Sequence, residues 1–328
     1  MVGVRKRILS GMRPTGKLHL GHLVVLENWV RLQENYDNFH LVADWHALTT
    51  DWDQTEELVE NTRQMVVDWL SVGIDPQKSP IFVQSHVAEH AELHLILSML
   101  ITVARLERNP AVKEQARQLH LEDKLAYGHL GYPVLQAADI LLYKGDFVPV
   151  GEDQVPHLEI ARELARRFNK LYAPVFPEPH AKLTRFKRLP GTDAQRMSKS
   201  LNNTILIADT PETIAQKLRK CITDPQKVRK GDPGRPDICP VFQYHQKSHP
   251  RTVDEVRAGC ESGQLGCVED KRDMAQKLIE YLDPIWERRR LLEKHADLTE
   301  QVIEDGDKRA RAVAQKTMAE VRRAMKLP

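Results

Sequence analysis

Short apolar runs alternate with longer stretches of helical spacing through the first half of the chain. The apolar runs, which predict β-strands, span residues 8–10, 40–43, 81–84 and 147–150. Helical spacing predicts helices at residues 21–33, 56–72, 91–106, 134–143 and 153–168. Strands that alternate with helices are typical of crossover units on a parallel sheet. The pattern therefore predicts an α/β fold with a buried parallel sheet.

The second part of the chain has a different pattern. From Thr210 onward the strand signals fade, and helices are predicted at residues 211–221, 253–258, 270–292 and 299–324. A chain of 328 residues is also long enough for about two domains. We therefore predict an α/β domain over residues 1–207 and an all-helical domain over residues 208–328.

Composition and charge exclude several classes of protein. Hydrophobic residues make up 41% and charged residues 29% of the chain, which excludes long disorder. The longest uncharged apolar stretch, residues 93–104, is too short for a membrane helix, and the N-terminus lacks the apolar region of a signal peptide. We expect a cytoplasmic protein that does not bind membranes. The net charge of +2 indicates no partner by itself, and the basic clusters are either solvated helix faces or phosphate contacts.

Two histidines lie at the entrance of the first predicted helix. His19 and His22 are three residues apart, and Gly21 stands between them. Backbone amides and the helix dipole favour an anion at this point, and a glycine lets a flat ligand lie against the backbone. The segment is therefore a candidate nucleotide site, although two histidines at this spacing also occur as metal ligands or as surface residues.

A second candidate segment is the loop over residues 189–203, which contains Arg196-Met197-Ser198-Lys199-Ser200. Two cations and two hydroxyls on a loop suit a polyphosphate whose charge grows in a transition state. A solvated basic loop is the alternative interpretation. The two segments together are more specific than either one.

Two carboxylate positions also stand out. Asp139 lies in an otherwise apolar predicted helix, where a buried carboxylate needs a hydrogen-bond donor from the protein or from a ligand. Glu152 and Asp153 follow Gly151 at a strand-to-helix turn, where carboxylates bind ribose hydroxyls in nucleotide folds. Asp153 can equally cap the following helix.

These segments resemble the class I aminoacyl-tRNA synthetases and, among them, the bacterial-type tryptophanyl-tRNA synthetase family. Residues 19–22 match the HIGH signature with Leu20 in place of isoleucine, and residues 196–200 match KMSKS with Arg196 in place of lysine. Residues 137–143, 148–154, 168–170 and 322–325 are similar to that family as well. The resemblance implies a Rossmann-like catalytic domain, a helical anticodon-binding domain and a homodimer that binds tRNA(Trp) and not DNA.

The resemblance also implies roles for individual residues, with ATP and Mg²⁺ as cofactors and L-tryptophan as substrate. The implied catalytic residues are Lys199, Arg196, His19 and His22. The implied ATP-binding residues are Arg13, Pro14, Thr15, Gly21, His22, Gly151, Glu152, Asp153, Leu189, Arg196, Met197, Ser198, Lys199 and Ser200. The implied tryptophan-binding residues are Asp139, Tyr132, His46, Gln136, Gln154 and Gly11. Asp139 would accept the indole N–H, which would reject phenylalanine by ~10⁴ or more, whereas His46 could equally be a structural core histidine.

Three cysteines raise the question of a metal. Cys239, Cys260 and Cys267 follow the order of a family subset that holds a [4Fe-4S] cluster with four cysteines, but Asp270 stands at the fourth position. Iron–sulfur clusters are normally held by thiolates, so the sequence favours an empty site over a cluster, with zinc as a further alternative.

Three other functions stay open from the sequence. Tyrosyl-tRNA synthetases share both signatures, although the turn at residues 151–154 and the C-terminal helices favour tryptophan. A small-molecule nucleotidyltransferase also uses a His-x-Gly-His turn, but it would not need a long basic helical domain. A non-catalytic RNA-binding paralogue would not need Lys199 and both histidines.

Overall fold

The computed structural model describes residues 5–118, 125–150, 155–183, 189–198 and 201–328. Six predicted site residues lie outside the described residues: Gly151, Glu152, Asp153, Gln154, Lys199 and Ser200. Contacts between Cα atoms divide the chain into two compact units. Unit 1 comprises Met1–Gly16, Asn28–Arg185 and His295–Pro328, and unit 2 comprises Lys17–Glu27 and Phe186–Lys294. These units do not coincide with the predicted domains, which meet at residue 207. The functional division at that residue stays a prediction.

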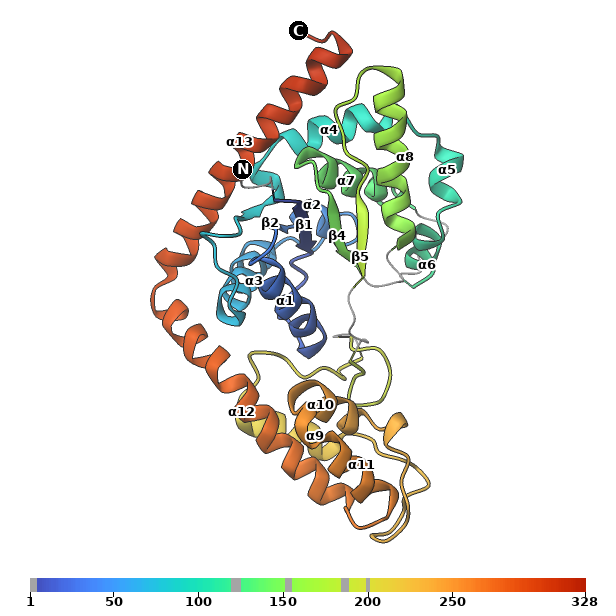
Figure 1. The fold of residues 1–328 in the computed structure, drawn as a ribbon, viewed down its shortest axis with the longest axis vertical. Helices are drawn as coiled ribbons and strands as arrows, with labels where there is room; N and C mark the ends of the chain where they lie inside the picture. Colours follow the sequence, from blue (N-terminus) through green and yellow to red (C-terminus); the bar gives the residue numbers. More distant parts are fainter. Residues whose placement is uncertain (1–4, 119–124, 151–154, 184–188, 199–200) are drawn as a thin grey trace. The chain divides into compact units, whose positions relative to one another are not determined.

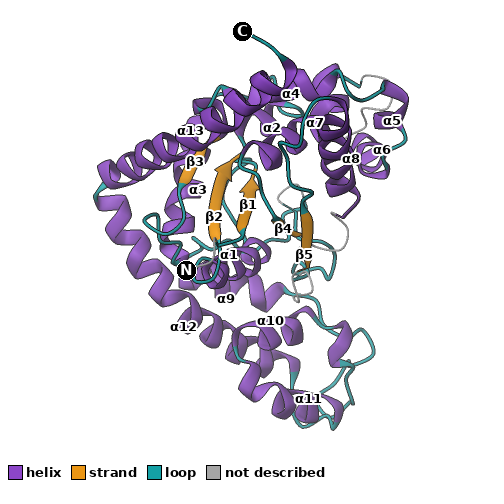
Figure 2. Cartoon of the chain, turned by 45° about the horizontal axis from the view of Figure 1, so that its top comes forward, coloured by secondary structure: helices purple, strands orange, loops and turns teal. Residues whose placement is uncertain are grey.

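Unit 1 is built on a parallel sheet, as the sequence predicts (Figure 2). The strands are β1 (Arg7–Met12), β2 (Asp37–Val42), β3 (Ile81–Val83), β4 (Phe147–Val150) and β5 (His180–Leu183). Their order is β3-β2-β1-β4-β5, and every neighbouring pair is parallel. The strand order therefore reverses between β1 and β4, which is the arrangement of a Rossmann-like fold and the place where such sheets bind ligands.

Helices cover both faces of this sheet because the side chains of a strand alternate between its two faces. Phe39 and Leu41 point into a hydrophobic core formed with α4 (Glu89–Ser98), α7 (Tyr127–Leu142), α8 (Val155–Leu171) and α13 (Ala296–Met325). His40, between them on β2, stacks on Trp29 of α1 (Leu20–Leu32). It also lies edge-on to Trp69 of α3 (Leu58–Val72). Three further short helices are α2 (Asp44–Leu48), α5 (Val103–Glu107) and α6 (Pro110–Gln118).

The C-terminal helix α13 belongs to unit 1. This helix (Figure 1) lies beside β3, at the edge of the sheet (Figure 2). Its buried residues Ala310, Ala314, Met318 and Val321 complete the core of this unit. The predicted helix at residues 299–324 is thus confirmed, although its packing joins it to the sheet.

Unit 2 contains α9 (Pro211–Lys220), α10 (Pro240–Ser248), α11 (Val253–Glu261) and α12 (Cys267–Lys294). Backbone hydrogen bonds from Leu20 N–H to Ile205 O (2.9 Å) and from Ile207 N–H to Leu18 O (2.9 Å) join its two chain segments. The predicted helices are confirmed, and α10 is an addition. Among the described residues of the chain, no helix is long and apolar enough to cross a membrane.

One detail of the sheet differs from the prediction. Residues 147–150 form β4 as expected, but only Val148 is fully buried. The strand is short, and its flanking residues Phe147, Pro149 and Val150 are partly accessible.

Candidate active site

Three of the predicted tryptophan-binding residues lie on one face of α7. Tyr132, Gln136 and Asp139 are spaced by four and three residues, which places them on the same side of the helix. His46 comes from α2, directly after β2, and its ring lies 6.4 Å from that of Tyr132. Gly11 lies near the end of β1, where a Cβ would stand 2.8 Å from Leu41 O.

Asp139 is buried and held by three donors. His46 Nε2 lies 2.9 Å from Oδ2, and His90 Nδ1 lies 2.7 Å from Oδ1. Gln84 Nε2 lies 2.8 Å from Oδ1 and 3.0 Å from Oδ2. Burial alone would raise the pKa of Asp139, but the hydrogen bonds from the two histidines outweigh burial and hold its pKa well below the usual range. Asp139 is therefore a charged acceptor, and the protein's own donors stabilise its charge within an otherwise apolar helix.

The protein's own donors reach both oxygens of Asp139. A carboxylate offers about four lone-pair positions. The two histidines use one each, and the Gln84 amide lies within hydrogen-bond distance of both oxygens. A ligand with an N–H or O–H donor would therefore share the carboxylate with Gln84 or take over one of the Gln84 contacts.

Sequence reasoning missed three members of this network. Gln84 follows β3 in a short 3₁₀ turn and is fully buried. His90 is the second residue of α4 and is also fully buried, and its Nε2 lies 2.8 Å from the hydroxyl of Tyr143. Burial raises the pKa of Tyr143 well above its ordinary value, so that its hydroxyl stays protonated and can donate to His90. The position of Gln84 at the carboxyl end of a predicted strand was the signal that could have identified it.

The HIGH-like segment belongs to unit 2. The backbone N–H of His19 donates to His22 Nδ1 (3.2 Å), and the N–H of Gly21 donates to His19 Nδ1 (3.1 Å). The two rings lie 3.9 Å apart between their centroids. Because each Nδ1 accepts, the proton of each neutral imidazole is on Nε2, the nitrogen that can then donate to an anion.

The KMSKS-like loop lies beside this segment within unit 2. A Cβ on Gly21 would stand 2.9 Å from His19 Cε1 and 3.8 Å from Met197 Sδ, so the glycine provides the space in which the two motifs meet. Met197 and Leu189 are buried, Ser198 is partly buried and Arg196 is exposed. The structure thus places Met197 of one predicted motif beside Gly21 of the other.

A buried asparagine, which the sequence reasoning did not single out, organises the loop. The side-chain amide of Asn203 donates to Asp193 Oδ1 (2.8 Å) and to Arg196 O (3.0 Å). Its Oδ1 accepts from Ser198 N–H (2.8 Å). A Cβ on Gly191 would stand 2.4 Å from the Asn203 amide nitrogen, so this glycine is needed for the close approach.

Three further predicted ATP-binding residues follow β1 in unit 1. Pro14 is buried, whereas Arg13 and Thr15 are exposed. Arg13 Nη1 donates to Thr50 Oγ1 at 3.2 Å. Their exposure at the carboxyl end of the central strand is compatible with contact to a ligand.

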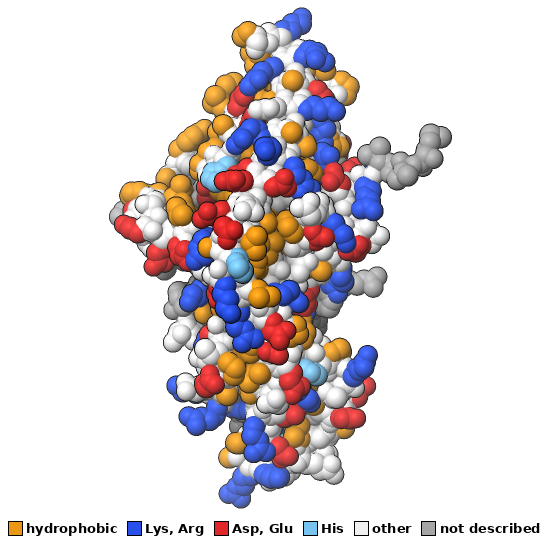
Figure 3. Space-filling view, turned by 90° about the vertical axis from the view of Figure 1, so that its left-hand side faces the viewer, with side chains coloured by type: hydrophobic (Ala, Val, Ile, Leu, Met, Phe, Trp, Pro, Cys, Tyr) orange, Lys and Arg blue, Asp and Glu red, His pale blue; other side chains and the backbone are white. Residues whose placement is uncertain are grey.

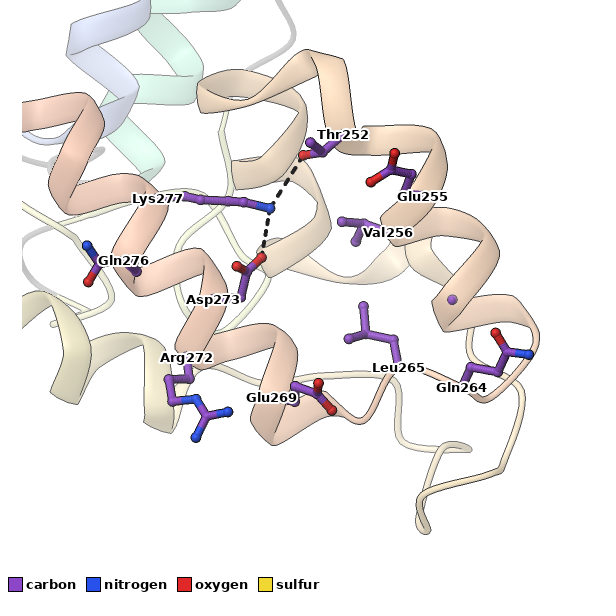
Figure 4. A pocket seen from close by; sticks show the side chains of 11 residues that line it. Thr252, Glu255, Val256, Gln264, Leu265, Glu269, Arg272, Asp273, Gln276 and Lys277 are labelled. Atoms are coloured by element: carbon purple, nitrogen blue, oxygen red, sulfur yellow. Dashed lines mark hydrogen bonds and ion pairs between the residues drawn. The ribbon is translucent and has the colours of Figure 1, made fainter.

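A separate groove lies in unit 2 between α11 and α12 (Figure 4). Lys277 points into it, where it pairs with Asp273 (2.8 Å) and donates to Thr252 Oγ1 (3.4 Å). None of the predicted site residues lines this groove. The pairing of Lys277 with Asp273 gives no indication of a reaction there.

The predicted metal ligands do not fit a cluster. Within the described residues no group of three or more His, Cys, Asp or Glu side chains is arranged to hold a metal ion. Asp270, at the fourth position, is hydrogen-bonded to the buried His245 (2.9 Å), and burial raises the pKa of Cys239 to about 11. An oxygen donor that is already bonded, beside a protonated thiol, does not match the thiolate set of an iron–sulfur cluster.

Comparisons with known proteins agree with the fold. Residues 3–283 match the family of class I tRNA synthetases (W and Y). The tryptophan–tRNA ligase of Thermotoga maritima is 53% identical, with 98% of this chain and 99% of that protein covered. The ligase of Aquifex aeolicus is 45% identical over 98% of this chain and all of that protein. The crystal structure of tryptophanyl-tRNA synthetase from Campylobacter jejuni, in complex with ADP and tryptophan, has a TM-score of 0.87 and 31% identity, with 98% and 100% coverage. The chain therefore belongs to the class I tRNA synthetases for tryptophan and tyrosine.

Proposed function

We propose that this chain is a tryptophan–tRNA ligase, which activates L-tryptophan with ATP and transfers it to the 3′ end of tRNA(Trp). Two relatives that are 53% and 45% identical over nearly their whole length carry this name. The similar structure from Campylobacter jejuni is a complex with ADP and tryptophan, which supports the use of an adenine nucleotide. Mg²⁺ enters as part of the substrate, bound to the phosphates of ATP.

The Asp139 carboxylate is the observation that carries the choice of tryptophan. It is charged and buried on an apolar helix, and its oxygens can only accept. The indole of tryptophan offers a single N–H that can only donate. Phenylalanine offers no donor to this carboxylate, so the site discriminates against it. Tyr132, His46, Gln136, Gln154 and Gly11 are the other tryptophan-binding residues in this proposal.

The first chemical step needs positioning and charge stabilisation more than a base. The tryptophan carboxylate attacks the α-phosphorus of ATP, and the bond to the β-phosphate oxygen breaks to give tryptophanyl-adenylate and pyrophosphate. His19 and His22 donate to phosphate oxygens, and Lys199 and Arg196 stabilise the charge on the leaving pyrophosphate. In both histidines Nδ1 accepts a hydrogen bond from a backbone N–H. This supports the role, because the proton of each neutral ring is then on Nε2, which can donate to the ligand.

The proposal includes further contacts to ATP. Gly21 gives the adenine close access to the backbone, and Glu152 and Asp153 accept the ribose hydroxyls. The other contacts in this proposal are Arg13, Pro14, Thr15, Gly151, Leu189, Met197, Ser198 and Ser200.

The second step passes the acyl group to a ribose hydroxyl of the terminal adenosine of tRNA(Trp), with AMP as the leaving group. We assign anticodon recognition to residues 208–328 and the chemistry to residues 1–207. On the face that Figure 3 shows, Lys and Arg side chains are interspersed with Asp and Glu, so phosphate contacts would depend on individual side chains rather than on a uniformly basic surface.

The protein would act in the cytoplasm as a homodimer. Leu95 and Met99, one helical turn apart at the end of α4, are exposed, as is the nearby Val103. Large apolar side chains that are grouped on a surface are typical of a contact between proteins, and a second copy of the chain is the partner that the family resemblance implies.

Amino-acid-dependent exchange of pyrophosphate into ATP tests the first step. Tryptophan, tyrosine and phenylalanine are compared with the wild-type protein and with Asp139→Ala. We expect exchange with tryptophan alone and its loss in the variant. Exchange with tyrosine would move the assignment to the sister enzyme, and no exchange with any of the three would overturn the proposal.

A further inference from the structure

Asp307 on α13 is fixed to the segment that follows β3. Its Oδ1 accepts from the backbone N–H of Val83 (3.0 Å), and its Oδ2 lies 2.6 Å from His86 Nδ1. The carboxylate is mostly buried, and it raises the pKa of His86 by its hydrogen bond. Because β3 is an edge strand, the Val83 N–H has no strand beyond it to bond, and the carboxylate takes the place of that strand.

The two contacts of Asp307 bracket Gln84. Val83 precedes this residue and His86 follows it by two positions, in the 3₁₀ turn Gln84–His86. Gln84 is the residue whose amide donates to both oxygens of Asp139. The orientation of that amide depends on the backbone at residues 83–86. Asp307 holds this segment through the backbone N–H of Val83 and the side chain of His86.

The backbone of α13 also lies directly on β3. A Cβ on Gly306 would stand 1.8 Å from Ile81 O, so only glycine permits this approach, and it places Asp307 at the end of the strand. Two residues further, Arg309 donates to Pro76 O (2.6 Å) and to Gln77 O (3.1 Å). Arg309 thus helps to hold the same helix in place, and these hydrogen bonds do not involve residues 83–86.

We propose that Asp307 is a positioning residue for tryptophan recognition, which acts through the backbone of residues 83–86 on Gln84 and thereby on the Asp139 carboxylate. The inference rests on the proposed function, in which Asp139 accepts the indole N–H. A C-terminal helix that only completed the core would need apolar residues, which Ala310, Ala314 and Met318 already supply. Asp307 adds hydrogen bonds to Val83 and His86, which flank Gln84 of the proposed tryptophan site.

The test compares tryptophan with an analogue that has sulfur in place of the ring N–H. The ratio of their kcat/KM values in pyrophosphate exchange reports the hydrogen bond to Asp139 and is insensitive to a general loss of active protein. We expect a high ratio for the wild type and a ratio near one for Asp139→Asn. For Asp307→Asn we expect a ratio lowered about tenfold, mainly through a higher KM for tryptophan.

Arg309→Ala is the matched control, since it loosens α13 at a contact that does not bracket Gln84, and its ratio should equal that of the wild type. An unchanged ratio in Asp307→Asn, or an equal fall in Arg309→Ala, overturns the inference. If Asp307→Asn does not fold, His86→Gln tests the other end of the bracket at a half-exposed side chain, and an unchanged ratio there also overturns it. A wild-type protein without tryptophan-dependent exchange would instead overturn the proposed function itself.

Discussion

His90 Nδ1 lies 2.7 Å from Asp139 Oδ1, with both side chains buried. Because the carboxylate is charged and can only accept, this nitrogen carries the proton, and the opposite nitrogen accepts from Tyr143. Tyr143, His90 and Asp139 therefore form one directed chain of hydrogen bonds. These hydrogen bonds hold the Asp139 carboxylate, which we propose accepts the indole N–H of the substrate.

Replacing His90 tests the importance of this chain. His90→Phe keeps the ring but removes the donor to a buried charge, which costs ~1.5–3 kcal/mol. We expect kcat/KM for tryptophan in pyrophosphate exchange to fall about 10- to 100-fold. Tyr143→Phe, which leaves His90 in place, should have a smaller effect. A His90→Phe variant with unchanged kcat/KM would contradict the assignment.

The hydrogen bonds of Asn203 within the loop over residues 189–203 lead to a second prediction. Asn203→Ala removes the bonds to Asp193, Arg196 and Ser198, and so loosens the loop that bears the catalytic cations. We expect kcat for exchange to fall by about tenfold or more while KM for tryptophan stays unchanged, because the loop stabilises the leaving pyrophosphate. Gln195→Ala, at an exposed position in the same loop, is the control. Equal effects of the two variants would show that Asn203 has no special role.

His40 makes stability depend on pH. The ring is fully buried between Trp29 and Trp69, neither ring nitrogen has a hydrogen-bond partner among the described residues, and burial lowers its pKa to about 3. The unfolded chain binds a proton near pH 6.5 and the folded chain does not, so stability is full above pH 6.5 and falls as the pH drops towards 3. The loss at pH 5 is about 2 kcal/mol.

Urea unfolding at pH 7.5 and pH 5 checks this expectation. In His40→Phe the part of the pH dependence that is due to this ring should vanish, whereas the exposed His295→Gln should retain it. A His40→Phe variant that loses as much stability between the two pH values as the wild type would show that His40 is not the responsible group.

The approach of α13 to β3 predicts contrasting effects at two helical glycines. Gly306→Ala would force a Cβ to within 1.8 Å of Ile81 O, so we expect a loss of ~3 kcal/mol or more in the free energy of unfolding. At Gly128, near the start of α7, a Cβ would meet nothing within 4 Å. Gly128→Ala should be neutral or stabilising by up to ~1 kcal/mol. Thermal unfolding of both variants measures this difference, and we expect a lower Tm for Gly306→Ala than for Gly128→Ala. Similar Tm values for the two would contradict the packing described for α13.

Much of the fold followed from local patterns. The predicted strands at residues 8–10, 40–43, 81–84 and 147–150 are all present, because buried parallel strands leave continuous apolar runs. β5 (His180–Leu183) was missed because it contains a histidine and a lysine and is only four residues long. The helix α10 was missed because it begins at Pro240, directly after a stretch that contains several prolines and glycines, which favour loops.

The candidate site was predicted less completely, for a physical reason. Asp139 could be recognised because a carboxylate in an apolar helix needs donors. The donors Gln84 and His90 lie 55 and 49 residues earlier in the chain, and no local pattern connects them to Asp139. Asp307, in the last helix, is further away still. Only the three-dimensional fold brings these side chains together.

Transfer of labelled tryptophan to a tRNA(Trp) transcript tests the central claim most directly, because it requires both chemical steps. The assay compares tryptophan with tyrosine in the wild-type protein and in Asp139→Asn. We predict charging with tryptophan and not with tyrosine, and a loss of charging in the variant. Charging with tyrosine, no charging at all, or full activity of Asp139→Asn with tryptophan would contradict the account.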